Sequence, residues 1–313
     1  MTIRIHLGAH KTATSELQYA LRTVRGRLAR GGLGYLGPRA LRSESLPLYA
    51  AMHETHPEAA PKLRAGLADW LGAHEHHLIS EENIIGSTYR GSMFGAGGQL
   101  YPHAATNLAR LLDLMGHPQV ELFLSLRDPA LFVTSAYGQQ LRMGVSIDID
   151  SYIKGVDIAA LSWADLARRL LAVPGVTRLI VWRYEYYNAL RPLLLERMLG
   201  PALAAIVPPP SRRNAGISAA AYNALLQTAM EDLDTPVAEL VRQACAAHPR
   251  VRGVPSMRPL RPRLYLRSRR AYMHDLAEMA GIERVEMLRR EDVLAPQDAD
   301  AGQDEDEPDA DPA

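Results

Sequence analysis

Short apolar segments alternate with longer amphipathic segments along most of the chain. Residues 3–7 alternate apolar and polar side chains and end at Gly8, which predicts a strand. Residues 15–29 repeat apolar side chains at helical spacing, which predicts a helix directly after it. A strand, a short turn and a helix in this order open an α/β unit.

The same alternation continues beyond this first unit. The segment 120–126 is nearly all apolar, as expected of a parallel strand that is covered on both faces. Further strands are predicted at 77–80 and 176–182. Helices are predicted at 59–73, 104–115, 129–143, 160–172, 187–199, 217–231, 236–247 and 266–281, with a Pro- and Arg-rich loop or linker at 249–264. The predicted fold class is therefore α/β, a central parallel sheet flanked by helices with a helical C-terminal part at about 210–290.

Charge is distributed unevenly along the chain. The sequence has 35 basic and 35 acidic residues, but eight of the acidic ones lie between Asp298 and Ala313, where no Lys or Arg occurs. Apart from Pro, the segment 296–313 has no apolar side chain larger than Ala, so it is predicted to be a disordered acidic tail behind a single domain of residues 1–295. The basic remainder indicates either a solvated surface or an anionic ligand.

Several classes of protein are disfavoured by the composition. Cys245 is the only cysteine, which excludes an intrachain disulfide and a cysteine-based zinc site. Neither a membrane-spanning apolar run nor a signal peptide is expected, so a cytoplasmic location is predicted. No helix-turn-helix pattern or interleaving of aromatic and basic residues is found, so nucleic acid is not an expected partner. The oligomeric state is left open.

The turn after the first strand carries the first candidate site. It reads Gly-Ala-His-Lys-Thr-Ala-Thr-Ser over residues 8–15. Such a turn aims backbone N–H groups at one point beside the positive end of a helix dipole, and Lys11 adds a full charge. This set suits a phosphate or phosphosulfate group. A plain turn, capped by Thr14 or Ser15 with Lys11 on the surface, is the alternative. The turn is not a Walker A loop, because no Gly-Lys-Ser/Thr ends it.

A second candidate site follows the strand at 120–126. Arg127 ends this strand and Ser135 lies in the helix after it. Ligands of open α/β sheets bind at the carboxyl ends of the strands, and a guanidinium group suits a phosphate. The alternative is that Arg127 pairs with Asp128 or with a neighbouring helix.

Four motifs together resemble the family of sulfotransferases that use 3′-phosphoadenosine 5′-phosphosulfate (PAPS), particularly its bacterial members. Residues 8–15 resemble the 5′-phosphosulfate loop, although Ala13 replaces a common Gly and Ser15 a common Thr. Arg-Asp-Pro at 127–129, with Ser135 and Tyr137 after it, resembles the 3′-phosphate motif. Trp-Arg-Tyr-Glu at 182–185 and Arg-Arg-Asn-Ala-Gly-Ile-Ser at 212–218 resemble two weaker motifs of the family.

The resemblance implies a P-loop-like sulfotransferase fold and no metal. It implies that Lys11 contacts the bridging oxygen and the 5′-phosphate of PAPS. The loop around that group would consist of Gly8, His10, Thr12, Ala13, Thr14 and Ser15. It further implies that Arg127 and Ser135 hold the 3′-phosphate, that Tyr184 lies near the adenine, and that Arg212 or Arg213 closes over the nucleotide. The product would be 3′-phosphoadenosine 5′-phosphate (PAP), and the acceptor a hydroxyl or amine of a carbohydrate or small metabolite.

A general base must take the acceptor proton. The segment Ser-Glu-Glu-Asn at 80–83 follows a predicted strand, and similar sulfotransferases place a carboxylate there. Matching the pattern Ser-x-Glu-Asn selects Glu82 before Glu81, whereas both could simply favour a helix N-terminus. His10 and His103 are further candidates. On the acceptor side we expect Tyr137, Gln140 and Arg142.

Two other functions are compatible with parts of this pattern. A P-loop-type kinase of a small metabolite would depend on ATP and Mg²⁺, and the missing Walker A pattern argues against it. A non-catalytic nucleotide-binding protein would bind PAP without turnover, and a base beside the phosphosulfate would then have little purpose.

Overall fold

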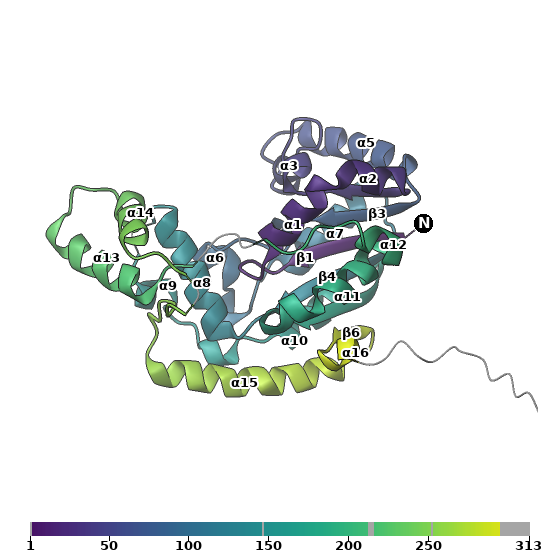
Figure 1. Cartoon of the computed structure of the whole chain (residues 1–313). Helices are drawn as coiled ribbons and strands as arrows, with labels where there is room; N and C mark the ends of the chain where they lie inside the picture. The colour runs from purple at the N-terminus through teal and green to yellow at the C-terminus, as the bar shows by residue number, and fades with distance from the viewer. Residues whose placement is uncertain (1, 146, 212–215, 252, 295–313) are drawn as a thin grey trace, which may run out of the picture.

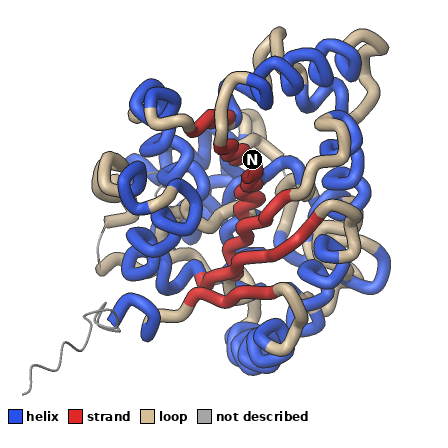
Figure 2. Tube along the Cα trace, turned by 90° about the vertical axis from the view of Figure 1, so that its right-hand side faces the viewer, coloured by secondary structure: helices blue, strands red, loops and turns tan. Residues whose placement is uncertain are grey.

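The computed structural model describes residues 2–145, 147–211, 216–251 and 253–294. Its centre is a six-stranded, all-parallel sheet in the order β2-β3-β1-β4-β5-β6, with helices on both faces (Figure 1; Figure 2). The strands are β1 (Thr2–Gly8), β2 (Leu33–Leu36), β3 (His76–Ser80), β4 (Val120–Leu126), β5 (Val176–Arg183) and β6 (Val285–Leu288). The predicted α/β class with a parallel central sheet is confirmed.

The two edge strands were not predicted. β2 and β6 have four residues each, too few for a hydrophobic period to be recognised. β6 also corrects the expectation of a purely helical C-terminal part, because it pairs with β5 and completes the sheet.

The helices follow the predicted pattern with local differences. Their bounds are α1 (Thr14–Thr23), α2 (Arg25–Arg30), α3 (Pro38–Leu41), α4 (Leu48–Met52), α5 (Ala59–Gly72), α6 (Arg90–Met93), α7 (Ala104–Leu114), α8 (Pro129–Arg142), α9 (Ile149–Tyr152), α10 (Trp163–Leu171), α11 (Tyr187–Leu199), α12 (Pro201–Ala204), α13 (Ala219–Glu231), α14 (Val237–Ala247), α15 (Pro262–Ala280) and α16 (Glu291–Leu294). The helix predicted at 15–29 is two helices, because Val24 leaves the helical conformation at φ −107° and ψ 6°. α15 begins earlier than predicted, at Pro262, since proline fits the first helical turn. The predicted tail 296–313, Arg212 and Arg213 lie outside the described residues.

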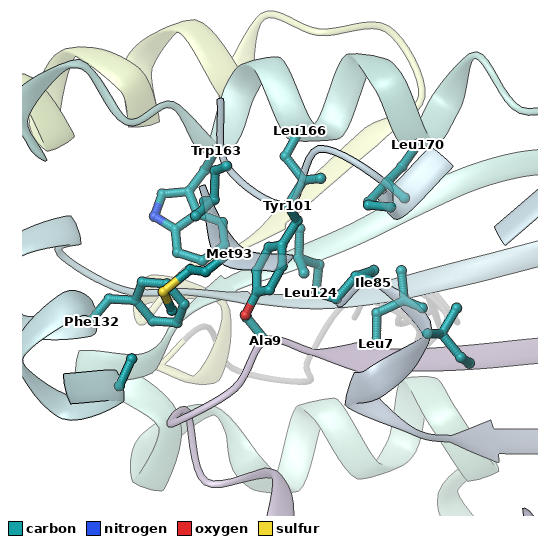
Figure 3. Close-up of a cluster of buried hydrophobic side chains, with 14 of the residues drawn as sticks. Leu7, Ala9, Ile85, Met93, Tyr101, Leu124, Phe132, Trp163, Leu166 and Leu170 are labelled. Atoms are coloured by element: carbon teal, nitrogen blue, oxygen red, sulfur yellow. The ribbon is translucent and has the colours of Figure 1, made fainter. Parts of the chain in front are cut away.

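The sheet separates two hydrophobic layers. Ile3, Ile5 and Leu7 of β1 point into the larger layer, which includes α7, α8, α10 and α15. Phe132 of α8 and Trp163 of α10 meet there edge to face, with ring centroids 5.2 Å apart, near Tyr101 and Ala9 (Figure 3). The smaller layer joins α1, α2 and α11 to the opposite face of the sheet. Both layers hold β1 and β4 firmly, so the residues that follow these strands have fixed positions.

Two further observations complete the architecture. α13 and α14 lie side by side near the far end of α8, away from the sheet (Figure 1). Across the ranges that the structure describes, no helix is both long enough and apolar enough to cross a membrane.

Candidate active site

The turn of residues 8–15 lies at the carboxyl end of β1, between β3 and β4 in the middle of the sheet. Gly8 has φ +91°, and a Cβ atom there would lie 3.1 Å from Cγ2 of Thr14 and 3.2 Å from Cβ of Glu82. Both the positive φ and the close approach favour glycine. The turn after β1 is therefore packed directly against the turn after β3.

Two residues of this turn adopt the left-handed conformation without being glycine. Lys11 has φ 62° and Ala13 has φ 68°, a backbone region that costs a non-glycine residue of order 1–2 kcal/mol. Ala13 stands at the N-cap of α1 and makes no side-chain capping bond. The alternative of a plain turn capped by Thr14 or Ser15 is therefore wrong.

The backbone N–H groups of residues 11–15 are not hydrogen-bonded within the fold. Within the part of the chain that the structure describes, none of these five groups donates to a protein acceptor, whereas the N–H of His10 interacts with the Tyr101 hydroxyl. The buried hydroxyls of Thr12 and Thr14 instead donate to the carbonyl oxygen of Ala9, at 2.6 and 3.3 Å, and so shape the turn. Ser15 is exposed at the start of α1. A cluster of unpaired N–H groups at a helix N-terminus suits an anion.

Lys11 is held at the edge of this cluster. Its Nζ donates to Oε1 of Gln139 at 3.2 Å. Burial, together with the nearby positive charges of Arg142 and Arg127, lowers the pKa of Lys11 from 10.5 to about 8, while Glu82 opposes this shift. An anion that binds beside Lys11 is expected to stabilise its charged form, because the ammonium is buried among other cations.

Arg127 reaches the same turn from β4. Its Nη1 donates to the carbonyl oxygen of Lys11 at 2.7 Å, and its Cζ lies 4.6 Å from the ring centroid of Tyr184. Asp128 is engaged elsewhere: it caps α8 by accepting from the N–H groups of Ala130 and Leu131, at 2.9 and 3.3 Å. The alternative pairing of Arg127 with Asp128 is therefore not what the structure shows.

Ser135 and the predicted acceptor-side residues Tyr137 and Gln140 lie on different faces of α8. Ser135, half-buried, lies one turn before Gln139 and so shares the face that contacts Lys11. The predicted acceptor-side residues Tyr137 and Gln140 are both buried on other faces. Tyr137 packs against Tyr152 and Tyr222, and Gln140 donates to Oγ1 of Thr88 at 2.8 Å. The prediction that these two residues face the acceptor is wrong, because both side chains are buried and bound to other parts of the fold.

Arg142, the third of the predicted acceptor-side residues, is exposed at the end of α8. Its positive charge contributes to the lowered pKa of Lys11. Its Nη2 lies 3.7 Å from Sγ of Cys245 on α14.

The carboxylate of Glu81 is hydrogen-bonded within the fold. Its carboxylate is only 2% exposed and accepts from Nη2 and Nε of Arg42 at 2.6 and 3.0 Å. It also accepts from the N–H of Asn83 at 3.1 Å, which caps the short 3₁₀ helix Glu82–Ile84. Burial raises the pKa of Glu81, and the hydrogen bonds from Arg42 oppose that rise. No oxygen of this carboxylate is left to take a proton from a ligand without breaking these bonds.

Glu82 has a different environment although it is the next residue. Its side chain is 17% exposed, and Oε2 accepts from Nε2 of Gln18 at 2.7 Å. Oε1 lies 3.8 Å from Nη2 of Arg42, too far for a good hydrogen bond. Its Cβ lies close to Gly8, so Glu82 is beside the turn that carries Lys11.

The two histidine candidates are placed differently. Nδ1 of His10 accepts from the hydroxyl of Tyr101 at 2.8 Å, and Nε2 donates to Oδ1 of Asn83 at 3.0 Å, in the tautomer that satisfies both partners. Burial is the main cause that lowers the pKa of His10. Both ring nitrogens are therefore occupied in a neutral ring. His103 is exposed at the start of α7.

Three residues of the site were missed from the sequence. Gln18 follows Thr14 by four positions and Gln139 follows Ser135 by four, so helical spacing could have placed both beside the turns. Arg42 comes from a loop after α3, and no local pattern indicates its pairing with Glu81.

Comparisons with known proteins add one distant likeness. No protein-family description matches the chain, and no curated protein matches its sequence. A solved structure of a sulfotransferase from Alicyclobacillus acidocaldarius is similar over 80% of this chain and 97% of that chain, with 12% identity and a TM-score of 0.40. At this identity and TM-score the likeness carries no argument about chemistry, so the function must be argued from the site itself.

Proposed function

We propose that this chain is a sulfotransferase that moves the sulfuryl group of PAPS to an acceptor hydroxyl or amine. The observation that supports this most directly is the 2.7 Å contact between Arg127 and the backbone of Lys11. It holds the Arg127 guanidinium against the backbone of the residue that carries the Lys11 ammonium, so that two cationic residues from separate strand ends lie at one edge of the sheet. A nucleotide with phosphates at both its 5′ and 3′ positions has the two anionic groups that such a pair can hold.

The turn of residues 8–15 is the proposed site of the 5′-phosphosulfate. The five unpaired backbone N–H groups of residues 11–15, the helix dipole of α1 and the ammonium of Lys11 all favour an anion at this point. Arg127 and Ser135 are the proposed partners of the 3′-phosphate. Tyr184, whose ring lies against the Arg127 guanidinium, orients that guanidinium by a cation–π contact and borders the proposed adenine position. Arg212 and Arg213 belong to the proposal by resemblance alone.

Glu82 is the proposed general base, because its neighbour Glu81 is already fully bonded. In the proposed step the acceptor proton passes to the Glu82 carboxylate while the acceptor oxygen or nitrogen bonds to sulfur. The bond between sulfur and the phosphate oxygen breaks, and PAP leaves. Lys11 stabilises the negative charge that develops on the departing oxygen. Most of the work is positioning and electrostatic stabilisation, as in phosphoryl transfer.

Calorimetry with PAP, ADP and Mg-ATP side by side tests the nucleotide. We expect PAP to bind at least tenfold more tightly than ADP, because ADP lacks the 3′-phosphate. Equal affinities for PAP and ADP would remove the case for a 3′-phosphate site. Preference for Mg-ATP would favour the kinase alternative.

A turnover assay with PAPS and a panel of hydroxyl and amine acceptors tests catalysis. Tight binding of PAP with no PAP released from PAPS, under any acceptor, would favour a non-catalytic nucleotide-binding protein. A carbohydrate is our first choice of acceptor, and this choice rests on the resemblance to bacterial sulfotransferases.

A further inference from the structure

The start of α15 and the loop before it form the most basic stretch of the chain. Residues 249–270 contain eight Arg and neither Asp nor Glu. Six of these arginines are exposed and described by the structure, and we call them the arginine surface: Arg258, Arg261, Arg263, Arg267, Arg269 and Arg270. The surface plays no part in the proposed transfer reaction.

Most of this charge has no counter-charge in the fold. Arg267 pairs with Asp157, and Arg258 lies over the ring of Tyr265. For the other four arginines, the described residues provide no acidic partner within ion-pair distance. Arg261 and Arg263 also line a cavity of about 200 Å³, together with Asp150. One carboxylate cannot balance this number of guanidinium groups, so an anionic partner with several charges fits the surface.

The same chain contains a segment of opposite charge. Residues 298–313 hold eight acidic residues and no basic ones, and residues 1–297 carry a formal charge of +8. The arginine surface contributes six of the positive charges of residues 1–297. Four of the acidic residues are consecutive, from Asp304 to Glu307, a higher charge density along the chain than that of the arginine surface.

The acidic segment starts close enough to reach the surface. Leu288 of β6 pairs with Trp182 of β5, which pairs with Ser125 of β4. Adjacent strands lie about 4.8 Å apart, so the end of β6 is about 10 Å from β4. The acidic segment begins after the further short helix α16, which contacts α11. Ser268, in the middle of the arginine surface, donates to Asp128 just beyond β4, at 3.0 Å. A random coil of nineteen residues has a root-mean-square end-to-end distance of about 24 Å.

We infer that the acidic segment 298–313 binds the arginine surface of its own chain. Each exposed ion pair is weak and screened by salt, so the contact must involve several pairs at once. The short connection gives the two parts a high effective concentration. Docking of this kind neutralises the surface and keeps other polyanions from it.

A spin label on the acidic segment tests the contact in the full-length chain. Ala301→Cys, in a Cys245→Ser background, carries the nitroxide, and the amide signals of residues 263–270 are the readout. We expect these signals to lose at least half of their intensity in about 0.01 M salt and to recover in about 1 M salt, because the screening length falls from about 30 to about 3 Å.

A matched pair of triple variants separates docking from simple tethering. Arg263→Gln, Arg269→Gln and Arg270→Gln together should restore most of the lost intensity. Arg25→Gln, Arg27→Gln and Arg30→Gln, which remove the same charge from the exposed face of α2, should leave the loss unchanged. Equal losses in both triple variants, or no loss in the parent at low salt, would overturn the inference. Circular dichroism of each variant verifies that the fold is retained.

A vesicle experiment tests whether the arginine surface binds an anionic membrane instead of the acidic segment. Leu266 and Met273 are 67% and 51% exposed on α15 beside the arginines, a combination also found in helices that lie on membranes. If the parent shows no label effect but binds phosphatidylserine vesicles through the arginine surface, the intramolecular contact is wrong. Neither readout uses a nucleotide, so failure here leaves the proposed transfer reaction untouched.

Discussion

The turn after β1 and the turn after β3 lie against each other but have opposite hydrogen-bonding states. The first leaves five backbone N–H groups without a partner among the described residues, and the Lys11 ammonium donates to Gln139. The second bonds every oxygen of Glu81 within the fold and leaves Glu82 partly open. A polar group is available to a ligand only where the fold does not satisfy it. The number of hydrogen bonds that the fold leaves unmade, rather than the type of residue, therefore separates the proposed site from the Glu81–Arg42 pair that supports it.

Glu82→Gln tests whether the open carboxylate of the second turn is the general base. If Glu82 is the base, we expect the transfer rate to fall by roughly 10²–10⁴-fold. Binding of PAP should be unchanged or slightly tighter, because a negative charge near the turn is removed. Rates of PAP release from PAPS and calorimetry of PAP binding measure the two effects.

Glu81→Gln is the matched control for that substitution. It should retain most of the activity per folded molecule and lose stability instead. Full activity in the Glu82→Gln variant would exclude Glu82 as the base and reopen the choice.

Lys11→Met and Arg127→Met test the proposed 5′- and 3′-phosphate sites separately. A lost charge-assisted hydrogen bond is worth about 1.5–3 kcal/mol, which corresponds to roughly 10–150-fold in affinity. Lys11→Met should weaken PAP and ADP alike, since both carry a 5′-phosphate group. Arg127→Met should weaken PAP but leave ADP within about threefold. Parallel losses for both ligands in the Arg127 variant would contradict a role at the 3′-phosphate.

Arg42→Met tests the supporting turn. It leaves the Glu81 carboxylate buried and unpaired, which is destabilising. Because the Arg42 side chain is 48% exposed, we expect a loss of about 2 kcal/mol in the free energy of unfolding, less than for a fully buried pair. Urea denaturation measures it. The double variant Arg42→Met with Glu81→Gln should recover part of the loss, and additive losses would indicate that the two residues do not stabilise each other.

The smallest effect that we predict is a pH dependence of PAP binding. Burial and neighbouring cations lower the pKa of Lys11 to about 8. The protonated ammonium is the form that attracts phosphate, so a bound anion raises this pKa and binding takes up a proton. Affinity should therefore be constant below about pH 7 and fall, by less than tenfold per pH unit, as pH rises through 8.

Lys11→Arg is the control for the pH experiment. Arginine stays charged over this range, so the decline above pH 8 should disappear. A decline that persists in this variant would belong to another group.

Much of the fold could be predicted because its strands and helices are long enough to show a period. β1, β4 and β5 have seven, seven and eight residues, and all three were expected close to their observed bounds. β2 and β6 were missed, since four residues carry no recognisable pattern. The break at Val24 was missed because the apolar spacing continues through it from α1 into α2.

The candidate site was only partly accessible from the sequence. Lys11, Arg127 and Glu82 were singled out by their places after predicted strands, and the structure brings all three to one edge of the sheet. Tyr137 and Gln140 were misjudged because the faces of α8 could not be assigned without their partners, which are α9 and α13 for Tyr137 and Thr88 for Gln140. Gln18 and Gln139 were overlooked since glutamine has no charge to draw attention to it.

The sequence by itself determined the order of the elements, the parallel sheet and the residue types at the strand ends, because these follow from hydrophobic periods and local turn chemistry. Only the tertiary structure decided which of two adjacent carboxylates is open. Glu81 and Glu82 are of the same type and adjacent, and only a family resemblance ranked Glu82 first; in the structure Arg42, from a different part of the chain, reaches Glu81 with two hydrogen bonds. Long-range pairing of this kind depends on how the layers pack, and no local pattern encodes it.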